Sequence, residues 1–345
     1  MQPSNIGHSL PTENSPDVDF MKLQKISESC FAILNEKNRL CDANSGFIHR
    51  GGGMLVDTQC DLSHARQMMS LIADVDSTPP RYVVNTHEDA DHVWGNQLFP
   101  ESEIIAHQSV PQRMRDVADP EPIRKLDRSI RNRFTRQILR WLHPGLFAVG
   151  TQLQQDYNFD EIELVFPTRL FDEQLELDLD GLAVHLLYVG PCHQVGDVIV
   201  HVPEEEVVFA GDIVFQECTP IGWAGTCENW MAALDLIVEL KPKTIVPGHG
   251  PTCDADGARE MRGYLEYTWG EAKRCFEKGI SSVEAAKEIE FGRFRSWHSP
   301  ARLYMIVERA YRELRGEPLD QPWSTIKSFD SIYQVAKSRG LELSF

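Results

Sequence analysis

Residues 86–92 read Thr-His-Glu-Asp-Ala-Asp-His and place four metal-binding types of side chain within six positions. Residues 81–87, RYVVNTH, have the apolar and β-branched character of a buried strand that runs directly into this motif. The ligand-type side chains are therefore expected in a loop at the carboxyl edge of a sheet. Such a loop can direct His87 and Asp89 to one cation, and Asp91 and His92 to a second cation.

Three later segments share one form, in which an apolar strand ends in a tight turn that carries a ligand-type residue. They are 189–197 (VGPCHQVGD), 207–212 (VVFAGD) and 245–250 (IVPGHG), and they contribute His193, Asp212 and His249. Imidazole and carboxylate ligands together suit zinc, iron or manganese. The sequence therefore predicts a dinuclear site for two divalent metal ions, Zn or Fe, with Mn as a further option. The predicted ligands are His87, Asp89, Asp91, His92, His193, Asp212 and His249.

The order of these residues resembles that of the metallo-β-lactamase superfamily over roughly residues 25–255. The signature of that family is His-x-His-x-Asp-His, followed by a distal His, a bridging Asp and a last His. Shorter stretches at 44–46 (Asn-Ser-Gly), 57–58 (Asp-Thr) and 95–96 (Gly-Asn) agree as well. The resemblance implies an α/β protein, an αβ/βα sandwich of two mixed sheets with the metals in the cleft between them. In that arrangement His87, Asp89 and His193 bind one metal, Asp91, His92 and His249 bind the other, and Asp212 bridges the two.

Asp89 departs from the family signature, which has a histidine at this position. A carboxylate there resembles the flavodiiron branch of the superfamily, which binds two irons. An oxygen ligand in place of a nitrogen shifts the preference of a site from zinc toward iron or manganese. The identity of the metal therefore stays open between zinc and iron.

The pattern of apolar residues divides the chain into three parts. Residues 1–20 are rich in Pro, Ser and Asn and are predicted to form a flexible arm. Residues 21–255 form the predicted metallo-β-lactamase-like domain, with a basic helical insertion at 108–147, and residues 256–345 form a helical extension. Within 108–147 we expect one short and one longer helix. Strands are expected at 30–34, 46–58 (a hairpin), 81–87, 103–107, 162–167, 175–179, 182–190, 197–203, 206–212 and 243–250, and helices at 62–75, 230–240, 259–279, 281–289 and 301–316.

The insertion is unusually basic for a chain whose net charge is −18. It could act as a lid that captures an anionic group of a small-molecule substrate, because arginine binds carboxylate and phosphate well. The alternative is a solvated helix face or a homodimer contact. Trp94, Trp141 and Trp223 are candidates to line an apolar pocket. The basic residues are Arg113, Arg115, Arg124, Lys125, Arg128, Arg131, Arg133, Arg136 and Arg140.

Composition excludes several classes of partner. The negative net charge disfavours nucleic acid and anionic membrane surfaces, both of which require excess Lys and Arg. No apolar run approaches the ~20 residues of a membrane-spanning helix, and the first residues lack a secretion signal. The eight cysteines are scattered without a CxxC pair, so a disulfide framework is not expected. These features predict a cytoplasmic protein.

The expected activity is metal-dependent hydrolysis of an ester, thioester, lactone or related bond by a hydroxide that bridges the two metals. Asp91 and Asp212 are the predicted catalytic residues, and no organic cofactor is expected. The alternative is a diiron redox enzyme of the oxygenase or O2- or NO-reducing type, which would use a separate electron donor. The extension of about 90 residues is too short for a flavodoxin-like domain and has no strand–loop–helix phosphate site. A non-catalytic metal-binding regulator is the third alternative.

Overall fold

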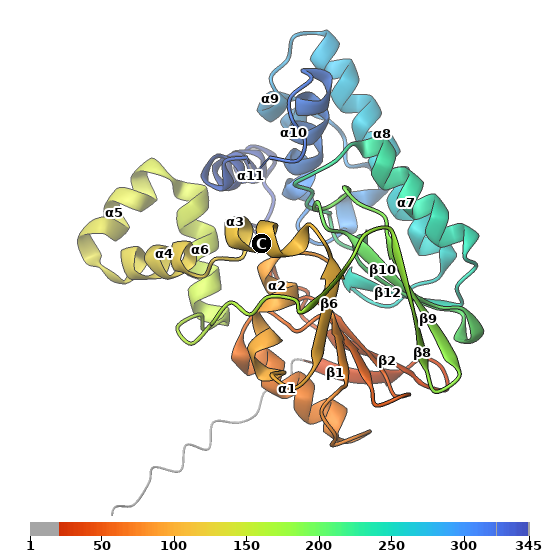
Figure 1. Ribbon diagram of the computed structural model, residues 1–345. Helices are drawn as coiled ribbons and strands as arrows, with labels where there is room; N and C mark the ends of the chain where they lie inside the picture. The colour runs from red at the N-terminus through yellow and green to blue at the C-terminus, as the bar shows by residue number, and fades with distance from the viewer. Residues whose placement is uncertain (1–20, 322, 344–345) are drawn as a thin grey trace, which may run out of the picture.

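The computed structural model describes residues 21–321 and 323–343, and two mixed β-sheets form its centre (Figure 1). The predicted N-terminal arm at 1–20 lies outside the described residues. The first sheet has the order β1-β2-β3-β4-β5-β6-β7, antiparallel from β1 to β4 and parallel from β4 to β7. Its strands are β1 (Met21–Lys25), β2 (Cys30–Asn35), β3 (Ser45–Ile48), β4 (Met54–Val56), β5 (Tyr82–Val84), β6 (Glu103–His107) and β7 (Arg169–Phe171).

The second sheet has the order β12-β11-β10-β9-β8, and only the β11–β12 pair is parallel. The inner faces of the two sheets share one apolar cluster, which includes Val84 and Ile105 from the first sheet and Val200 and Phe209 from the second. A Cβ atom added to Gly46 in β3 would lie 2.3 Å from the Phe209 ring, so only glycine fits at this close contact between the sheets. The strands of the second sheet are β8 (Gln174–Leu179), β9 (Leu182–Tyr188), β10 (Val198–Val202), β11 (Val207–Phe215) and β12 (Thr244–His249).

Helices cover the outer face of each sheet and complete the expected αβ/βα sandwich. Helix α1 (Leu62–Ala73) buries Met68 and Ile72 against the first sheet. Helices α7 (Cys227–Glu239) and α8 (Ala255–Glu277) pack on β11 of the second sheet and on each other. The predicted fold class is therefore confirmed, since the two sheets are mixed and each is covered by helices.

The predicted strand at 162–167 is wrong, because these residues are irregular in the structure. Arg124 from the helical insertion bonds to the start of this segment. Its guanidinium donates to the carbonyl oxygens of Phe159 (2.9 Å) and Ile162 (2.6 Å). The Ile162 carbonyl is thereby bonded to an arginine side chain instead of a neighbouring strand.

The insertion contains four helices, where the sequence predicted two. Asn132 ends one helix and begins the next, because its side chain accepts from the amides of Phe134 and Thr135. Pro144 begins the last helix, at a position where proline is well tolerated. Of the four helices, the last three project from the sandwich on one side, whereas the first lies close to it (Figure 1). They are α3 (Val110–Val117), α4 (Glu121–Arg131), α5 (Arg133–Leu142) and α6 (Pro144–Asp156).

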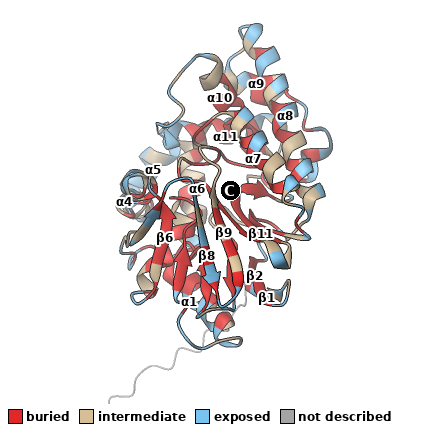
Figure 2. Ribbon diagram, turned by 45° about the vertical axis from the view of Figure 1, so that its right-hand side comes forward, coloured by how far each residue is buried: buried red, intermediate tan, exposed pale blue. Residues whose placement is uncertain are grey.

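The C-terminal part is helical, as predicted, and its buried residues join the largest apolar cluster of the molecule. Figure 2 shows α10 packed among α8, α9 and α11 with buried residues at their contacts. The last helix, α11, was not among the predicted elements, and it contacts α6 of the insertion. None of the helices in the described residues is long and apolar enough to cross a membrane. The helices of the C-terminal part after α8 are α9 (Ser282–Glu288), η3 (Gly292–Ser296), η4 (Pro300–Arg302), α10 (Leu303–Leu314) and α11 (Thr325–Arg339).

Candidate metal centre

The motif at 86–92 lies where the sequence predicted it, in the loop that follows β5 and in the short helix α2 (Ala90–Val93). His87 is in the loop, and Asp89 is the residue immediately before the helix. Asp91 and His92 are in the first turn of α2, so their side chains leave the backbone in a different direction. The change from loop to helix therefore separates the motif into two pairs of ligand-type side chains.

The other three residues come from the second sheet. His193 is in the loop between β9 and β10, Asp212 is in β11, and His249 is the last residue of β12. Strands β11 and β12 are parallel neighbours, which places Asp212 beside the end of β12. A Cβ atom added to Gly248 would lie 1.9 Å from Oδ1 of Asp212. Glycine at 248 therefore leaves the space that the Asp212 carboxylate occupies.

The seven side chains converge in two groups of three around Asp212. In the first group, Oδ2 of Asp89 lies 2.9 Å from Nε2 of His193 and 3.9 Å from Nε2 of His87. These ligand atoms, one from each residue, all lie within 4.8 Å of one another. This is the set that the sequence assigned to one metal, and the structure brings it together.

The second group has the same form. Oδ2 of Asp91 lies 3.7 Å from Nε2 of His92 and 3.4 Å from Nε2 of His249. Its three ligand atoms also lie within 4.8 Å of one another. This group corresponds to the set predicted for the second metal.

Asp212 contacts both groups through its two carboxylate oxygens. Its Oδ2 lies 3.3 Å from Nε2 of His193, and its Oδ1 lies 3.3 Å from Nε2 of His92. Its Oδ2 also lies 3.5 Å from Nε2 of His249. A carboxylate that faces histidines of both groups has the placement predicted for a bridging residue.

Hydrogen bonds fix the orientation of His87 and His92. Nδ1 of His92 lies 2.8 Å from Oδ2 of Asp57, a carboxylate that also accepts from the amide and hydroxyl of Thr86. Because the Thr86 hydroxyl donates to Asp57, its oxygen is free to accept from Nδ1 of His87 at 3.0 Å. Both rings therefore carry their proton on Nδ1 and turn a lone pair on Nε2 toward the centre.

Backbone carbonyls and a buried amide hold the remaining imidazoles. Nδ1 of His193 donates to the carbonyl oxygen of Ile221 at 2.6 Å, which again directs Nε2 inward. Asn44 donates to the carbonyl oxygens of Pro247 (3.0 Å) and Gly250 (2.8 Å) on either side of His249. The sequence stretch that includes Asn44, singled out by the family resemblance, therefore positions the last histidine of the set.

The donor atoms of this cluster fit a pair of cations. Among the described residues, Nε2 of His87, Nε2 of His92 and Oδ1 of Asp212 are buried and have no hydrogen-bond partner. Buried polar atoms without partners are costly and call for a ligand. Four imidazoles and three carboxylates are a donor set suited to zinc, iron or manganese.

The electrostatics of the cluster favour positive charge. Burial lowers the pKa of His193, but Asp212 and Asp89 outweigh it and raise the value to about 10. Burial likewise opposes protonation of His249, whose pKa is nevertheless raised to about 9 by Asp212. Burial raises the pKa of Asp212, but His249, His92 and His193 bring it well below its usual range. The carboxylates therefore stabilise a cation at this place.

Asp89, the residue that departs from the family signature, is held by a neighbour of His193. Its Oδ1 accepts a hydrogen bond from Nε2 of Gln194, while its Oδ2 faces His193 and His87. Sequence reasoning did not identify Gln194, although its position directly after a ligand-type residue is a usable signal. Asp197 accepts from the amides of Cys192 and Gln194, so it shapes this loop.

A cavity of about 530 Å³ opens at the seven-residue cluster. Asp89, Asp91, His193, Asp212 and His249 are part of its lining. Its apolar wall includes residues of α4 and α6 from the insertion and of α11 from the C-terminal part. The main apolar residues are Trp94, Ile123, Leu126, Leu146, Val149, Leu153, Phe215, Ile221, Trp223, Trp323, Ile326 and Phe329.

The insertion therefore lies over the cleft, but most of its basic residues do not face the cavity. Of the nine basic residues considered above, only Arg113 lines it. Arg128 pairs with Glu121, and Arg131 pairs with Asp127 on the exposed surface. Of the three tryptophans considered, Trp94 and Trp223 line the cavity, whereas Trp141 is 82% exposed on α5.

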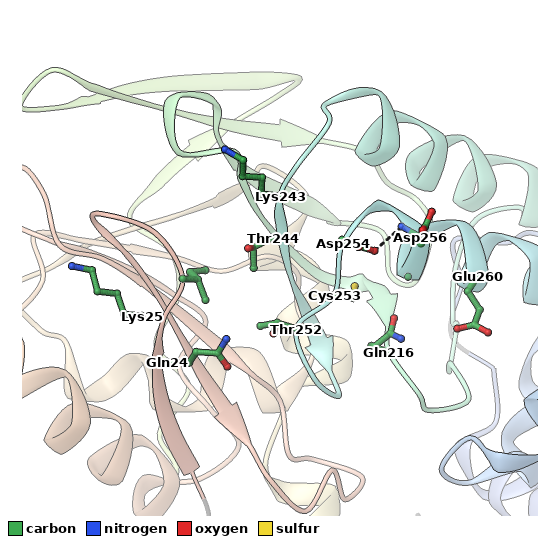
Figure 3. A pocket seen from close by; sticks show the side chains of 12 residues that line it. Gln24, Lys25, Gln216, Lys243, Thr244, Thr252, Cys253, Asp254, Asp256 and Glu260 are labelled. Carbon is green, nitrogen blue, oxygen red and sulfur yellow. Dashed lines mark hydrogen bonds between the residues drawn. The ribbon is translucent and has the colours of Figure 1, made fainter.

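Two other features of the described residues lie apart from this centre. A polar hollow of about 710 Å³ lies between β1, β12 and the start of α8 (its lining side chains are drawn in Figure 3), and none of the seven residues lines it. Cys60, Asp61 and His64 also form a group with close ligand-type atoms. Asp61, however, accepts from the amides of His64 and Asn158 and thereby caps α1. We interpret that group as structural.

Two mixed sheets, each covered by helices, form an αβ/βα sandwich, and the cluster comes from loops and strand ends of both sheets. The chain belongs to the metallo-beta-lactamase superfamily, whose family model matches residues 38–249. This confirms the resemblance noted from the motif. The superfamily is one of metallo-hydrolases, which supports divalent-metal binding and enzymatic activity in general terms.

The chain spans about half or less of the length of two of the relatives that it resembles. The chain is 29% identical to metallo-beta-lactamase type 2 from Bacteroides fragilis over 92 residues, which are 25% of this chain and 37% of that protein. The inverting sec-alkylsulfatase Pisa1 from Pseudomonas sp. has a TM-score of 0.64 and 16% identity, over 85% of this chain and 50% of that one. A metallo-beta-lactamase from Pontibacter korlensis has a TM-score of 0.51 and 15% identity, over 71% and 99%. These two structures show the shared fold.

Proposed function

We propose that the chain is a dinuclear metal-dependent hydrolase that cleaves an ester, thioester, lactone or related bond. The observation that supports this most is the division of seven side chains into two groups of three that meet at Asp212. Two bound cations would supply Lewis acidity and lower the pKa of a water molecule enough to make it a nucleophile near neutral pH.

The residues of the chain have separate roles in this proposal. His87, Asp89 and His193 hold one cation, the group of Asp91 holds the second, and Asp212 holds both. Asp57 and the Ile221 carbonyl keep the imidazoles in the required tautomer. The apolar walls contributed by α4, α6 and α11 exclude water from the bond to be cleaved. Asp91 and Asp212 are proposed as the catalytic carboxylates, since both belong to the cluster and line the cavity that the substrate would enter.

Elemental analysis and an ester panel test this proposal together. The protein is purified without added metal, its metal content is measured, and hydrolysis is assayed on short esters, thioesters and lactones. We expect two metal ions per chain and turnover that a chelator abolishes and added metal restores. Two bound ions with no hydrolysis of any compound in the panel would contradict the hydrolase proposal.

One observation favours a second candidate, a diiron redox enzyme. Asp89 supplies an oxygen ligand that prefers iron over zinc, and its carboxylate is correctly placed for that role. The described part of the C-terminal extension is made of helices and offers no strand of a flavin domain. Electrons for a redox enzyme of this kind would come from a donor outside the described residues. Oxygen consumption that requires a reductant, together with two bound irons, would support this candidate.

A further inference from the structure

Arg302 at the end of η4 is a buried cation that faces the cavity of the metal centre. Its side chain lines the cavity together with Asp91, Asp212 and His249, although only 3% of its surface is exposed. Nε and Nη2 are buried and have no hydrogen-bond partner among the described residues. Arginine stays protonated in proteins, so this side chain carries a positive charge without a bonded acceptor.

Arg309, which follows Arg302 by about two helical turns, is a buried arginine with a structural role and serves for comparison. It is also almost fully buried, but its Nε and Nη2 donate to the carbonyl oxygens of Gly225 (3.1 Å) and Thr226 (2.9 Å). Its guanidinium also lies over the Trp230 ring at 4.8 Å. Arg302 has no such contacts, and burial of an unpaired charge is strongly unfavourable.

The carboxylates of the cluster do not account for Arg302 once cations are bound. No ion pair joins Arg302 to a carboxylate within 4.0 Å in the part of the chain that the structure describes. Two divalent cations would more than neutralise Asp89, Asp91 and Asp212. The guanidinium would then add a further positive charge to the centre, and a negatively charged group in the cavity would compensate for it.

Apolar side chains form much of the remaining cavity wall, which also carries the charged residues Arg113, Asp116 and Asp119. Leu126 and Val149 come from the insertion, and Ile326 and Phe329 come from α11. A cavity of about 530 Å³ is within the usual range of ~300–1,000 Å³ for sites that enclose a small molecule. An aliphatic or aryl group fits these walls better than a polar one does.

We propose that Arg302 is a substrate-binding residue and that the substrate is an amphiphilic organic anion. Its carboxylate, sulfate or phosphate group is bound by the Arg302 guanidinium, and its apolar part occupies the space between α4, α6 and α11. This inference rests on the proposed hydrolase function, since it names the class of compound that reaches the metal centre. Arg302 lies outside residues 38–249, the part that matches the family model.

Binding of non-cleavable probes tests the proposal without turnover. Octanoate, octyl sulfate, octyl phosphate and neutral 1-octanol are titrated into zinc-loaded protein by isothermal calorimetry, for the native chain and for R302Q. We expect at least one anion to bind the native chain, and R302Q to bind it about 10-fold more weakly or worse, because a charge-assisted hydrogen bond contributes about 1.5–3 kcal/mol. Binding of 1-octanol and the metal content should stay unchanged.

Three comparisons keep the outcome interpretable. R302M serves if R302Q does not fold, and R302K should recover part of the affinity because it restores the charge. R309Q is the matched control, a buried arginine with partners, and it should leave anion affinity unchanged while it lowers stability. Equal anion affinity in the native chain and R302Q, or an equal loss for octanol and the anions, would overturn the proposal. The hydrolase proposal fails separately, through an inactive ester panel.

Discussion

Nε2 of His193 lies 2.9 Å from Oδ2 of Asp89, so the carboxylate that departs from the family signature points into the same space as a histidine of the set. The other oxygen of Asp89 is bonded to Gln194. A carboxylate that one neighbour orients and that faces two imidazoles is placed as a ligand, and its hardness should then influence the choice of metal.

Asp89→His should shift the metal preference of the site toward zinc, because imidazole suits zinc and a carboxylate suits iron or manganese. Both forms are produced with equal supplies of zinc and iron, and their metal content is compared. We expect a higher zinc-to-iron ratio in the variant. Identical ratios in both forms would mean that Asp89 does not set the preference.

Asp212→Ala should remove most of the bound metal, because this side chain faces histidines of both groups. We expect the metal content to fall from two ions per chain to fewer than one. Asp256→Ala is the control, since that exposed aspartate is remote from the cluster and pairs with Arg259. Full metal content in the Asp212 variant would rule out the bridging role.

Asp57→Asn should weaken metal binding about 10- to 100-fold, the usual effect of losing a carboxylate that orients a ligand histidine. The exchange tests orientation in particular, because Asn keeps an acceptor for Thr86 and tolerates the positive φ of 62° at this position. Affinity is measured by competition with a chelator of known strength. An unchanged dissociation constant would show that Asp57 has only a structural role.

Gly46→Ala should destabilise the sandwich by about 1–3 kcal/mol, because its Cβ would meet the Phe209 ring at 2.3 Å. Gly270→Ala is a matched exchange in α8, where an added Cβ meets nothing within 4 Å. It should stabilise the protein by about 0.5–1 kcal/mol through helix propensity. Urea denaturation measures both. Equal effects of the same sign would contradict the proposed contact between the sheets.

Asp42→Asn should lower the stability of the protein by an amount that depends on pH, because the buried Asp42 carboxylate pairs with Arg39. Burial raises the pKa of Asp42, but hydrogen bonds and charge from Arg39, with a bond from Tyr157, bring it below its usual value. Because the folded pKa is lowered, the carboxylate stabilises the fold fully above about pH 5 and loses this effect as the pH falls through the folded pKa.

The variant is expected to lose about 1.5–3 kcal/mol near neutral pH, because Arg39 loses its charge-assisted bonds to Asp42 but keeps its ion pair with Asp156. The difference from the native chain should shrink in acid. Stability is measured by denaturation at several pH values between about 3 and 7. A difference between native and variant proteins that does not change with pH would show that the charge of Asp42 is not the cause.

The motif residues were predictable because they are local. His87, Asp89, Asp91 and His92 lie within six positions after one strand, and the structure places them at the end of β5 as expected. His193, Asp212 and His249 were predictable through the repeated strand-and-turn pattern that contains each of them. Their grouping came from the family resemblance, and the structure agrees with it in geometry.

The walls of the cavity were not predictable in the same way. Arg302 stands at the start of the helix predicted at 301–316, where the local pattern gives no sign that its side chain is buried in a cavity wall, and α11 was not predicted. Within the irregular segment 162–167, the carbonyl oxygens of Ile162 and Val165 accept from Arg124 and Asn96, both of which lie far earlier in the chain. Contacts between elements distant in sequence decide these features, and a local pattern carries no information about such contacts.

Residue 249 is the last of the seven ligand-type positions, whereas Arg302, Ile326 and Phe329 line the cavity from the chain beyond residue 255. On the proposed function, some of the residues that bind the substrate therefore lie in a stretch that can diverge independently of the seven ligand-type residues. Two homologues could agree at every ligand and still act on different compounds. A comparison restricted to residues 38–249 would include the cavity walls contributed by α4 and α6 but would miss Arg302 and the residues of α11.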